Sequence, residues 1–356
     1  MINSHYVPQF ILRNFYKDNK ITYCDLEQKT IQPRNARSIF SEEGYYPEGI
    51  EHDLCKKAEY QFANLFHNKM ENARNSITFT ADELFTIKKF LIVSAVRYKY
   101  ELSEEDKARE KIFGPAFKID YDRCLNDILA CSRLEEVAEI VEKSETFLFG
   151  GLSEEEADNQ DDPNLQLWAE IKDVLYSYLI FVKPQSDEKF LIPDVGRGIY
   201  KGPLGLRKTT SIIESLQYND DPQLERLLQM ITPRDYTVFP LSRNLAIMTM
   251  CSFYKLFTKS EFNVRVKMPD EYPTLSSILE FGDSDAITPP KVSMKGMVKE
   301  YKYDIKQLVS RDICHFNSLM IGEATRYIAC ANLKDIQRSI ELAKEYTDRD
   351  LTFMKV

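Results

Sequence analysis

The spacing of the apolar residues changes partway along this chain of 356 residues, and the change limits the folds that it can adopt. From residue 50 to residue 177 apolar residues recur three or four positions apart, as they do along one face of an amphipathic helix. The first such stripe is Ile50, Leu54, Ala58, Phe62, Leu65 and Phe66. Thr80 and Glu83 then form a capping box before the next stripe. Further helices are predicted at 104–126, 133–148 and 163–177.

Short apolar runs bounded by turn residues follow at 178–182, 190–192, 237–241 and 246–250, which is typical of strands. The alternation over residues 21–32 predicts a hairpin, and helical spacing returns at 296–331 and 333–345. We therefore predict an α+β fold that is predominantly helical, with an N-terminal β-hairpin and a small antiparallel sheet in the second half. The expected domains are residues 1–185, with the hairpin and the helical region, and residues 186–356, with the sheet and long C-terminal helices. One continuous domain is the alternative.

Composition limits the classes of protein that this chain can belong to. Apolar residues make up 43% of the chain, enough for a hydrophobic core, and the formal net charge is −9. The chain therefore lacks an overall basic charge for nucleic acid, although a local basic groove is compatible with it. No apolar run approaches the roughly 20 residues that span a bilayer, so no membrane association is expected. Charged residues interrupt the N-terminus where a secretory signal would be apolar, and the seven cysteines are scattered, which together predict reduced thiols and a cytoplasmic location.

Three polar residues recur at intervals of four within the apolar N-terminal segment 5–15. His5, Gln9 and Arg13 share one side of a helix if that helix begins this early. A histidine with a polar neighbour that orients it suits general acid–base catalysis or phosphate binding. The alternative is that Pro8, which restricts Val7, leaves His5 outside the helix as a capping residue.

Two glutamates, Glu51 and Glu59, lie eight residues apart, slightly more than two helical turns. Paired carboxylates at this spacing can bind a divalent metal ion or share a proton transfer. The alternative is that they are surface charges or partners of lysines. A divalent metal ion is therefore the cofactor that this pattern suggests.

Asp194 follows a short apolar strand and precedes a segment, residues 196–208, that is rich in glycine and basic residues. A carboxylate at the end of a strand is a common place for a catalytic or ligand-positioning group. Glycines interleaved with basic residues can cradle a phosphate. The spacing matches neither the P-loop nor the dinucleotide-binding pattern, so a flexible loop is favoured.

The late predicted helix adds further polar candidates. His315 flanks Phe316, which is expected in the core, so a half-buried structural histidine is favoured over a ligand. Asn317 and Arg326 lie farther along. Residues 291–311 are locally basic, which is typical of a solvated helix face, with a nucleic-acid groove as the minor alternative. The sequence contains no nucleophile elbow, zincin helix, kinase set or cysteine–histidine signature.

The opening His5-Tyr6-Val7-Pro8-Gln9-Phe10-Ile11-Leu12-Arg13-Asn14-Phe15 resembles the start of a prokaryotic family known as domain of unknown function 4238. The resemblance continues through Glu51 and Glu59, Arg97, Trp168, Phe190 to Asp194, Phe239 to Ser242, and Asn317 with Ala324 to Arg326. Two positions depart from the family pattern. The segment Pro193 to Gly196 stands where members tend to have Ser-Asp-Asn-Pro, and Ser94 stands where glutamine is frequent. The resemblance indicates which residues to examine and implies no reaction.

These observations lead to three hypotheses about function. The first is a hydrolase or transferase acting on a phosphate-containing or nucleic-acid substrate in one cleft, where Asp194 or Glu59 orients His5 or binds metal. Its catalytic residues are His5, Asp194 and Glu59, and its substrate-binding residues are Gln9, Arg13, Arg97, Asn317 and Arg326. The second is a non-catalytic module that binds a ligand or a protein partner through the same side chains. The third is a buried structural network with no ligand.

Overall fold

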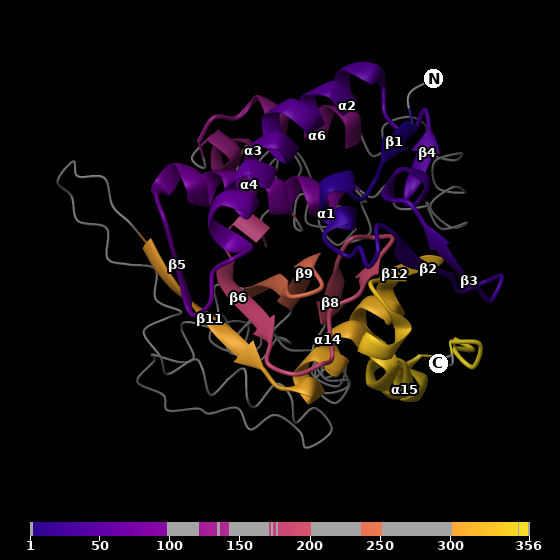
Figure 1. The fold of residues 1–356 in the computed structure, drawn as a ribbon. Coiled ribbons are helices and arrows are strands. Elements are labelled where there is room, and N and C mark those ends of the chain that lie inside the picture. Colours follow the sequence, from indigo (N-terminus) through magenta and orange to yellow (C-terminus); the bar gives the residue numbers. More distant parts are fainter. Residues whose placement is uncertain are drawn as a thin grey trace, which may run out of the picture.

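The computed structural model describes residues 3–97, 121–133, 136–141, 171, 174–175, 177–200, 236–250, 301–347 and 349–354. Within them a six-stranded sheet runs through the centre of the molecule (Figure 1). Its strands, in spatial order, are β5 (Ser76–Phe79), β11 (Tyr301–Leu308), β6 (Tyr178–Pro184), β10 (Leu245–Met250), β9 (Tyr236–Ser242) and β8 (Gly198–Tyr200). β11 runs parallel to β6, and the other neighbouring pairs are antiparallel. Consecutive residues of β6 are buried, as is typical of a strand covered on both faces.

Two smaller sheets hold the N-terminal segment. The predicted N-terminal hairpin is confirmed as β2 (Ile21–Asp25) and β3 (Thr30–Arg34). β2 also pairs with β12 (Tyr327–Cys330), which pairs in turn with the short β7 (Ile192–Pro193). A separate two-stranded sheet joins β1 (Asn3–His5) to β4 (Ser41–Glu43). This last pairing fixes the backbone of His5 opposite Ser41.

Helices lie on both sides of the central sheet. On one side are α2, α3, α4 and α6, and on the other are α14 and α15 (Figure 1). The helices and helical turns are α1 (Gln9–Arg13), η1 (Ala36–Ser38), α2 (Glu48–Leu54), η2 (Cys55–Glu59), α3 (Tyr60–Leu65), η3 (Phe66–Met70), α4 (Ala81–Arg97), α6 (Tyr121–Ala130), α14 (Ser310–Glu323), η7 (Leu333–Ile336) and α15 (Gln337–Tyr346). The run from α2 to η3 is one continuous helix in which η2 and η3 are π-helical turns.

Local sequence signals explain how these elements begin and pack. The capping box at α4 is confirmed: the backbone amide of Glu83 donates to Thr80 Oγ1, and that of Thr80 donates to Glu83 Oε2. Phe62 of α3 and Phe90 of α4 stack with their ring centroids 3.9 Å apart. At Gly198 in β8 an added Cβ would lie 2.7 Å from Met320, so glycine permits the close packing of α14 on this strand.

The prediction of a predominantly helical fold is wrong. Of the described residues 45% are helical and 27% lie in strands, which form sheets of two, four and six strands. The fold is α+β, but the main sheet is large and mixed rather than small and antiparallel. Residues 296–331 are not one helix, because this stretch contains β11, α14 and β12. In β11 the apolar residues Tyr301, Tyr303 and Ile305 alternate along the strand. Tyr301 and Tyr303 pair with β5, and Ile305 pairs with β6. These tertiary contacts decide the conformation against the helical spacing of the local sequence.

Some expectations remain open. Strands from both sides of residue 185 share the four-stranded and six-stranded sheets, while the division at that residue stays a prediction. No helix in the described part of the chain is long and apolar enough to cross a membrane. The six cysteines in that part are free thiols, and the cytoplasmic location stays a prediction. Trp168, residues 201–208 of the glycine-rich segment and residues 291–300 of the basic segment lie outside the described residues.

Candidate functional site

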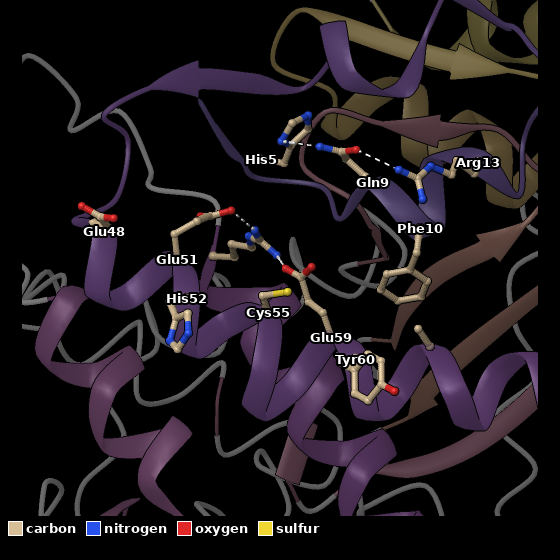
Figure 2. A pocket seen from close by; sticks show the side chains of 12 residues that line it. His5, Gln9, Phe10, Arg13, Glu48, Glu51, His52, Cys55, Glu59 and Tyr60 are labelled. Carbon is tan, nitrogen blue, oxygen red and sulfur yellow. Dashed lines mark hydrogen bonds and ion pairs between the residues drawn. The ribbon is translucent and has the colours of Figure 1, made fainter. Parts of the chain in front are cut away.

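A pocket of about 580 Å³ lies between α1 and the helical run from α2 to α3 (Figure 2). This volume lies within the range of small-molecule sites, roughly 300–1,000 Å³. Most of the residues that line it have polar or charged side chains. The lining residues are His5, Gln9, Phe10, Arg13, Glu48, Glu51, His52, Cys55, Glu59, Tyr60, Ala63 and Arg97.

A chain of hydrogen bonds connects the three N-terminal candidates along one wall of the pocket (Figure 2). Arg13 Nη2 donates to Gln9 Oε1 at 3.1 Å, and Gln9 Nε2 lies 3.4 Å from His5 Nδ1. Gln9 and Arg13 are one helical turn apart on α1, as their spacing predicts. His5 precedes this helix, in β1, which matches the alternative reading of Pro8. Its ring nevertheless joins the other two residues in the pocket.

This arrangement indicates which tautomer of His5 is present. Because Arg13 can only donate, the oxygen of Gln9 must face it, and the Gln9 amide nitrogen therefore faces the histidine. We assign Nδ1 of His5 as an acceptor and its proton to Nε2. Burial, together with the positive charge of Arg97, lowers the pKa of His5, while the backbone at Ala36 and Arg37 acts in the opposite direction. His5 is thus neutral near pH 7 and able to accept a proton at Nδ1.

Arg97, the last residue of α4, lines the floor of the pocket. Its side chain is 1% exposed and makes ion pairs through Nη1 with Glu59 and through Nη2 with Glu51, the latter at 3.7 Å. The guanidinium also lies 5.9 Å from the centre of the Tyr46 ring, and the Tyr46 hydroxyl donates to the Arg97 carbonyl. Burial alone would lower the pKa of Arg97, but Glu59, Tyr46 and Glu51 raise it. Arg97 therefore stays charged, and the neighbouring glutamates balance its charge inside the protein.

The two predicted carboxylates have different surroundings although both contact Arg97. Glu59 accepts a direct hydrogen bond from Arg97. Burial raises the pKa of Glu51, against the effect of the Arg97 charge, and its Oε2 is buried without a hydrogen-bond partner among the described residues. Arg97 Nε is likewise buried and unpartnered in that part of the chain. Both carboxylates thus pair with Arg97, and burial makes Glu51 easier to protonate than an exposed glutamate.

Sequence reasoning missed several pocket residues on the helical run, although a signal for them exists. Glu48, His52, Cys55, Tyr60 and Ala63 accompany the predicted Glu51 and Glu59. Steps of three or four from Glu48 lead through Glu51 or His52, Cys55 and Glu59 to Ala63, so one helix face carries most of them. The π-helical turn η2 begins at Cys55 and ends at Glu59, and such turns occur frequently at functional sites.

The structure does not bring Asp194, Asn317 or Arg326 into this pocket with His5, because none of the three lines it. Asp194 lies buried directly after β7. Its carboxylate accepts backbone N–H groups of Thr325 and Arg326 at 2.8 Å and of Tyr327 at 2.9 Å. Burial raises the pKa of Asp194, and these donors oppose the shift. These contacts support a structural role, in which Asp194 ties β7 to the turn before β12.

Asn317 and Arg326 also make structural contacts. Asn317 is fully buried on α14, where it accepts from the backbone of Leu191 and donates to Lys189 O and Ser339 Oγ. Arg326 forms a two-pronged ion pair with Asp25 on β2, through Nε at 3.1 Å and Nη2 at 2.8 Å. Both residues thus join segments distant in sequence, and their assignment to substrate binding has no support in this geometry.

The arrangement also bears on the suggested metal ion. Glu51 and Glu59 face the guanidinium of Arg97, which occupies the position that a cation between them would take. Among the described residues no group of three or more His, Cys, Asp or Glu side chains is placed to hold a metal ion. The pocket residues are therefore suited to binding through hydrogen bonds and ion pairs.

Comparison with known proteins identifies the family to which this chain belongs. The model of a family described as "Protein of unknown function (DUF4238)" matches residues 3–332. The match covers most of the chain, including every residue that lines the pocket. Neither the curated proteins nor the solved structures contained a match.

Proposed function

The chain belongs to the DUF4238 family of proteins of unknown function, and from its pocket we propose that it is a hydrolase or transferase acting on a phosphate-containing substrate. The observation that carries this proposal is the line of contacts from Arg13 through Gln9 to His5. It places a cation, an amide and a neutral imidazole in sequence along one wall. A phosphate beside Arg13 would lie within reach of a base that is already neutral at pH 7.

In the proposed reaction His5 Nδ1 removes the proton from an attacking water or hydroxyl group. The oxygen of that group forms a bond to phosphorus, and the leaving oxygen departs with the electron pair of the bond that breaks. Glu51, whose pKa burial raises, supplies the proton to the leaving oxygen. The contact between Gln9 and Nδ1 is long for a hydrogen bond, so an attacking hydroxyl can replace it. Arg97 and Glu59 hold the floor of the pocket in place.

The charges of the lining limit the substrate that enters the pocket. Two arginines face three glutamates, and Arg97 is already paired with Glu59 through a direct hydrogen bond. Arg13 is therefore the pocket cation that remains available for an anion. We propose that one phosphate group binds at the Arg13 end, while hydroxyl or amine groups of the same molecule meet the carboxylates at the other end.

Turnover of p-nitrophenyl phosphate and bis(p-nitrophenyl) phosphate, combined with thermal unfolding in the presence of AMP, tests this proposal. His5→Asn should lower turnover by a factor of about 100 or more and retain ligand binding. Arg13→Gln should weaken AMP binding. The matched control is His67→Asn, because His67 is exposed and does not line the pocket. Unchanged turnover in His5→Asn would eliminate His5 as the base.

The second hypothesis, a non-catalytic binding module, predicts a different result from the same samples. A ligand at about 100 times its Kd adds about 2.7 kcal/mol to the free energy of unfolding. A thermal shift that depends on Arg13, with no turnover of any phosphate ester, would favour the binding module. If neither a thermal shift nor turnover is observed, the third hypothesis, a structural network with no ligand, is favoured.

A further inference from the structure

Five exposed cations lie at the end of α1 and on the turn, strand and helical turn that follow it. We call this set the basic edge, and it consists of Arg13, Lys17, Lys20, Arg34 and Arg37. Arg13 belongs both to it and to the pocket. The remaining four are absent from the pocket lining. The basic edge is notable because the chain as a whole carries a net charge of −9.

The backbone contacts of this region bring the five residues together. Lys17 and Lys20 close a tight turn through mutual backbone hydrogen bonds of 2.8 and 3.1 Å. Ile21, which follows that turn, pairs with Arg34 in the sheet. The hydroxyl of Tyr16 donates to Asn35 and accepts from the amide of Ala36, which fixes the start of η1 and hence Arg37 against the end of α1.

The charges of the basic edge are not neutralised by the rest of this region. Asp25 and Glu27 pair with Arg326, and Lys29 pairs with Asp350. The five cations have no carboxylate within ion-pair distance in the described part of the chain. Asp18, in the Lys17–Lys20 turn, is the remaining carboxylate among residues 13–37. The region therefore presents a local excess of positive charge to solvent.

We propose that the basic edge binds the phosphate backbone of a single-stranded nucleic acid, one nucleotide of which enters the pocket. This inference rests on the proposed function, since it names the substrate class of the same site. Successive phosphates would contact the basic edge, and Arg13 would hold the phosphate nearest to His5. Tyr60 lines the pocket and is 65% exposed, so it offers an aromatic surface on which an unpaired base can stack. A pocket of about 580 Å³ accepts one nucleotide and excludes a base pair with its backbones.

Fluorescence anisotropy with labelled oligo-dT and oligo-U of about 12 nucleotides tests the inference, because such lengths cover the usual site sizes of single-strand binders. Binding to single strands weakens with salt by about 0.7 log units per log unit of salt for each phosphate neutralised. Five contacts give a slope near −3.5 between about 50 and 300 mM KCl. Comparing dT with U shows whether DNA or RNA is preferred.

The test variant is the triple change Lys17→Gln, Lys20→Gln and Arg34→Gln. It should make the salt slope shallower by about 2, because three phosphate contacts are lost. The matched control is Lys302→Gln, Lys334→Gln and Arg338→Gln, which removes the same charges from exposed positions elsewhere. The control should keep the slope of the unmodified protein. An equal loss in both triple variants would mean that only net charge matters, and would overturn the inference.

Further measurements distinguish a failure of this inference from a failure of the proposed function, and a single strand from a duplex or a membrane as the partner. The test variant should retain turnover of p-nitrophenyl phosphate. Turnover without oligonucleotide binding overturns the inference and leaves the proposed function intact. Binding that depends on the basic edge, without turnover, supports the inference and contradicts the function. Stronger binding to a duplex of the same length, or binding to phosphatidylserine vesicles instead of oligonucleotides, would also overturn it.

Discussion

His315 shows how burial of a single side chain links the stability of the fold to pH. It lies on α14 with its Nε2 2.9 Å from the hydroxyl of Tyr236, and burial lowers its pKa to about 4. Between about pH 4 and the unperturbed value near 6.5 the unfolded state binds a proton that the folded state does not. Stability is therefore lost as the pH falls through this window.

We expect His315 to contribute a loss of about 3 kcal/mol in the free energy of unfolding between about pH 6.5 and pH 4. Urea unfolding at several pH values measures it. His315→Gln should reduce this pH dependence, whereas His67→Gln, at an exposed position, should not. Because burial also lowers the pKa of His5, part of the dependence should persist in His315→Gln. An identical pH dependence in all three proteins would show that His315 titrates normally.

Asp194 is the residue whose structural role can be tested most directly. Its carboxylate accepts three backbone N–H groups in the turn before β12. Asparagine keeps the shape but replaces one acceptor with a donor, so at least one N–H group loses its partner. We expect Asp194→Asn to lower the free energy of unfolding by about 2–3 kcal/mol. Chemical unfolding compares it with Asp304→Asn, which removes an exposed charge. Asp194→Asn with normal stability and no turnover would instead support a catalytic role.

The residue scale also shows what the sequence could indicate about the site. His5, Gln9 and Arg13 were identified because their spacing is local and four residues form one turn. The sequence predicts a catalytic or ligand-positioning role for Asp194, but its carboxylate contacts backbone amides more than 130 residues away. A carboxylate at a strand end has the same local pattern whether it binds a ligand or a distant turn. Only the tertiary structure distinguishes these two roles.

At the scale of elements, two adjacent lysines join α4 to other helical segments. Lys88 Nζ donates to the carbonyls of Val174 at 2.6 Å and Ser177 at 2.5 Å, as well as to Ser177 Oγ. Lys89 Nζ donates to the carbonyls of Leu129 and Cys131 at the end of α6. Carbonyls at helix ends lack partners within their own helix, so each ammonium satisfies groups that burial would otherwise leave unpaired.

We expect Lys88→Met to lower the free energy of unfolding by about 2 kcal/mol, because methionine fills the space but cannot donate to the two carbonyls. The variant no longer buries an ammonium group, and the desolvation cost that is removed offsets part of the loss in stability. Lys56→Met is the control, since Lys56 is exposed. Urea midpoints of the two variants and the unmodified protein measure the effect. A variant as stable as the unmodified protein would mean that the carbonyls find other partners.

The start of α4 and the strands β6, β9 and β10 follow from local patterns in the sequence, whereas β11 was predicted as helix. The start of α4 follows from Thr80 and Glu83, because both partners of the capping box lie within one turn. β11 has no such signal. Its Ile305 and Leu308 are buried three residues apart, a step that also suits a helix. Its partners β5 and β6 come more than 100 residues earlier, and a single sequence contains no record of that pairing.

At the scale of the whole molecule, the sheets connect the two halves of the chain. β6 ends at Pro184, yet both of its neighbours, β10 and β11, come from beyond residue 185. β2 in the first half likewise pairs with β12 near the end of the chain. The buried Phe181 and Val182 of β6 therefore have no strand beside them unless the second half is present. These pairings determine how a fragment should behave.

We expect a fragment of residues 1–185 to lack a stable native fold, because β6 would expose two unpaired edges and its apolar side chains. The fragment should bind a hydrophobic dye, show poor dispersion in its amide NMR spectrum and unfold without a sharp thermal transition. The full chain is the control. Addition of residues 186–356 in trans should restore a cooperative transition if the strands can pair between fragments. A fragment that unfolds cooperatively by itself, with a dispersed spectrum, would instead establish residues 1–185 as an independent domain. In that case the pairing of β6 with β10 and β11 would act as an interface between two domains rather than as the framework of one.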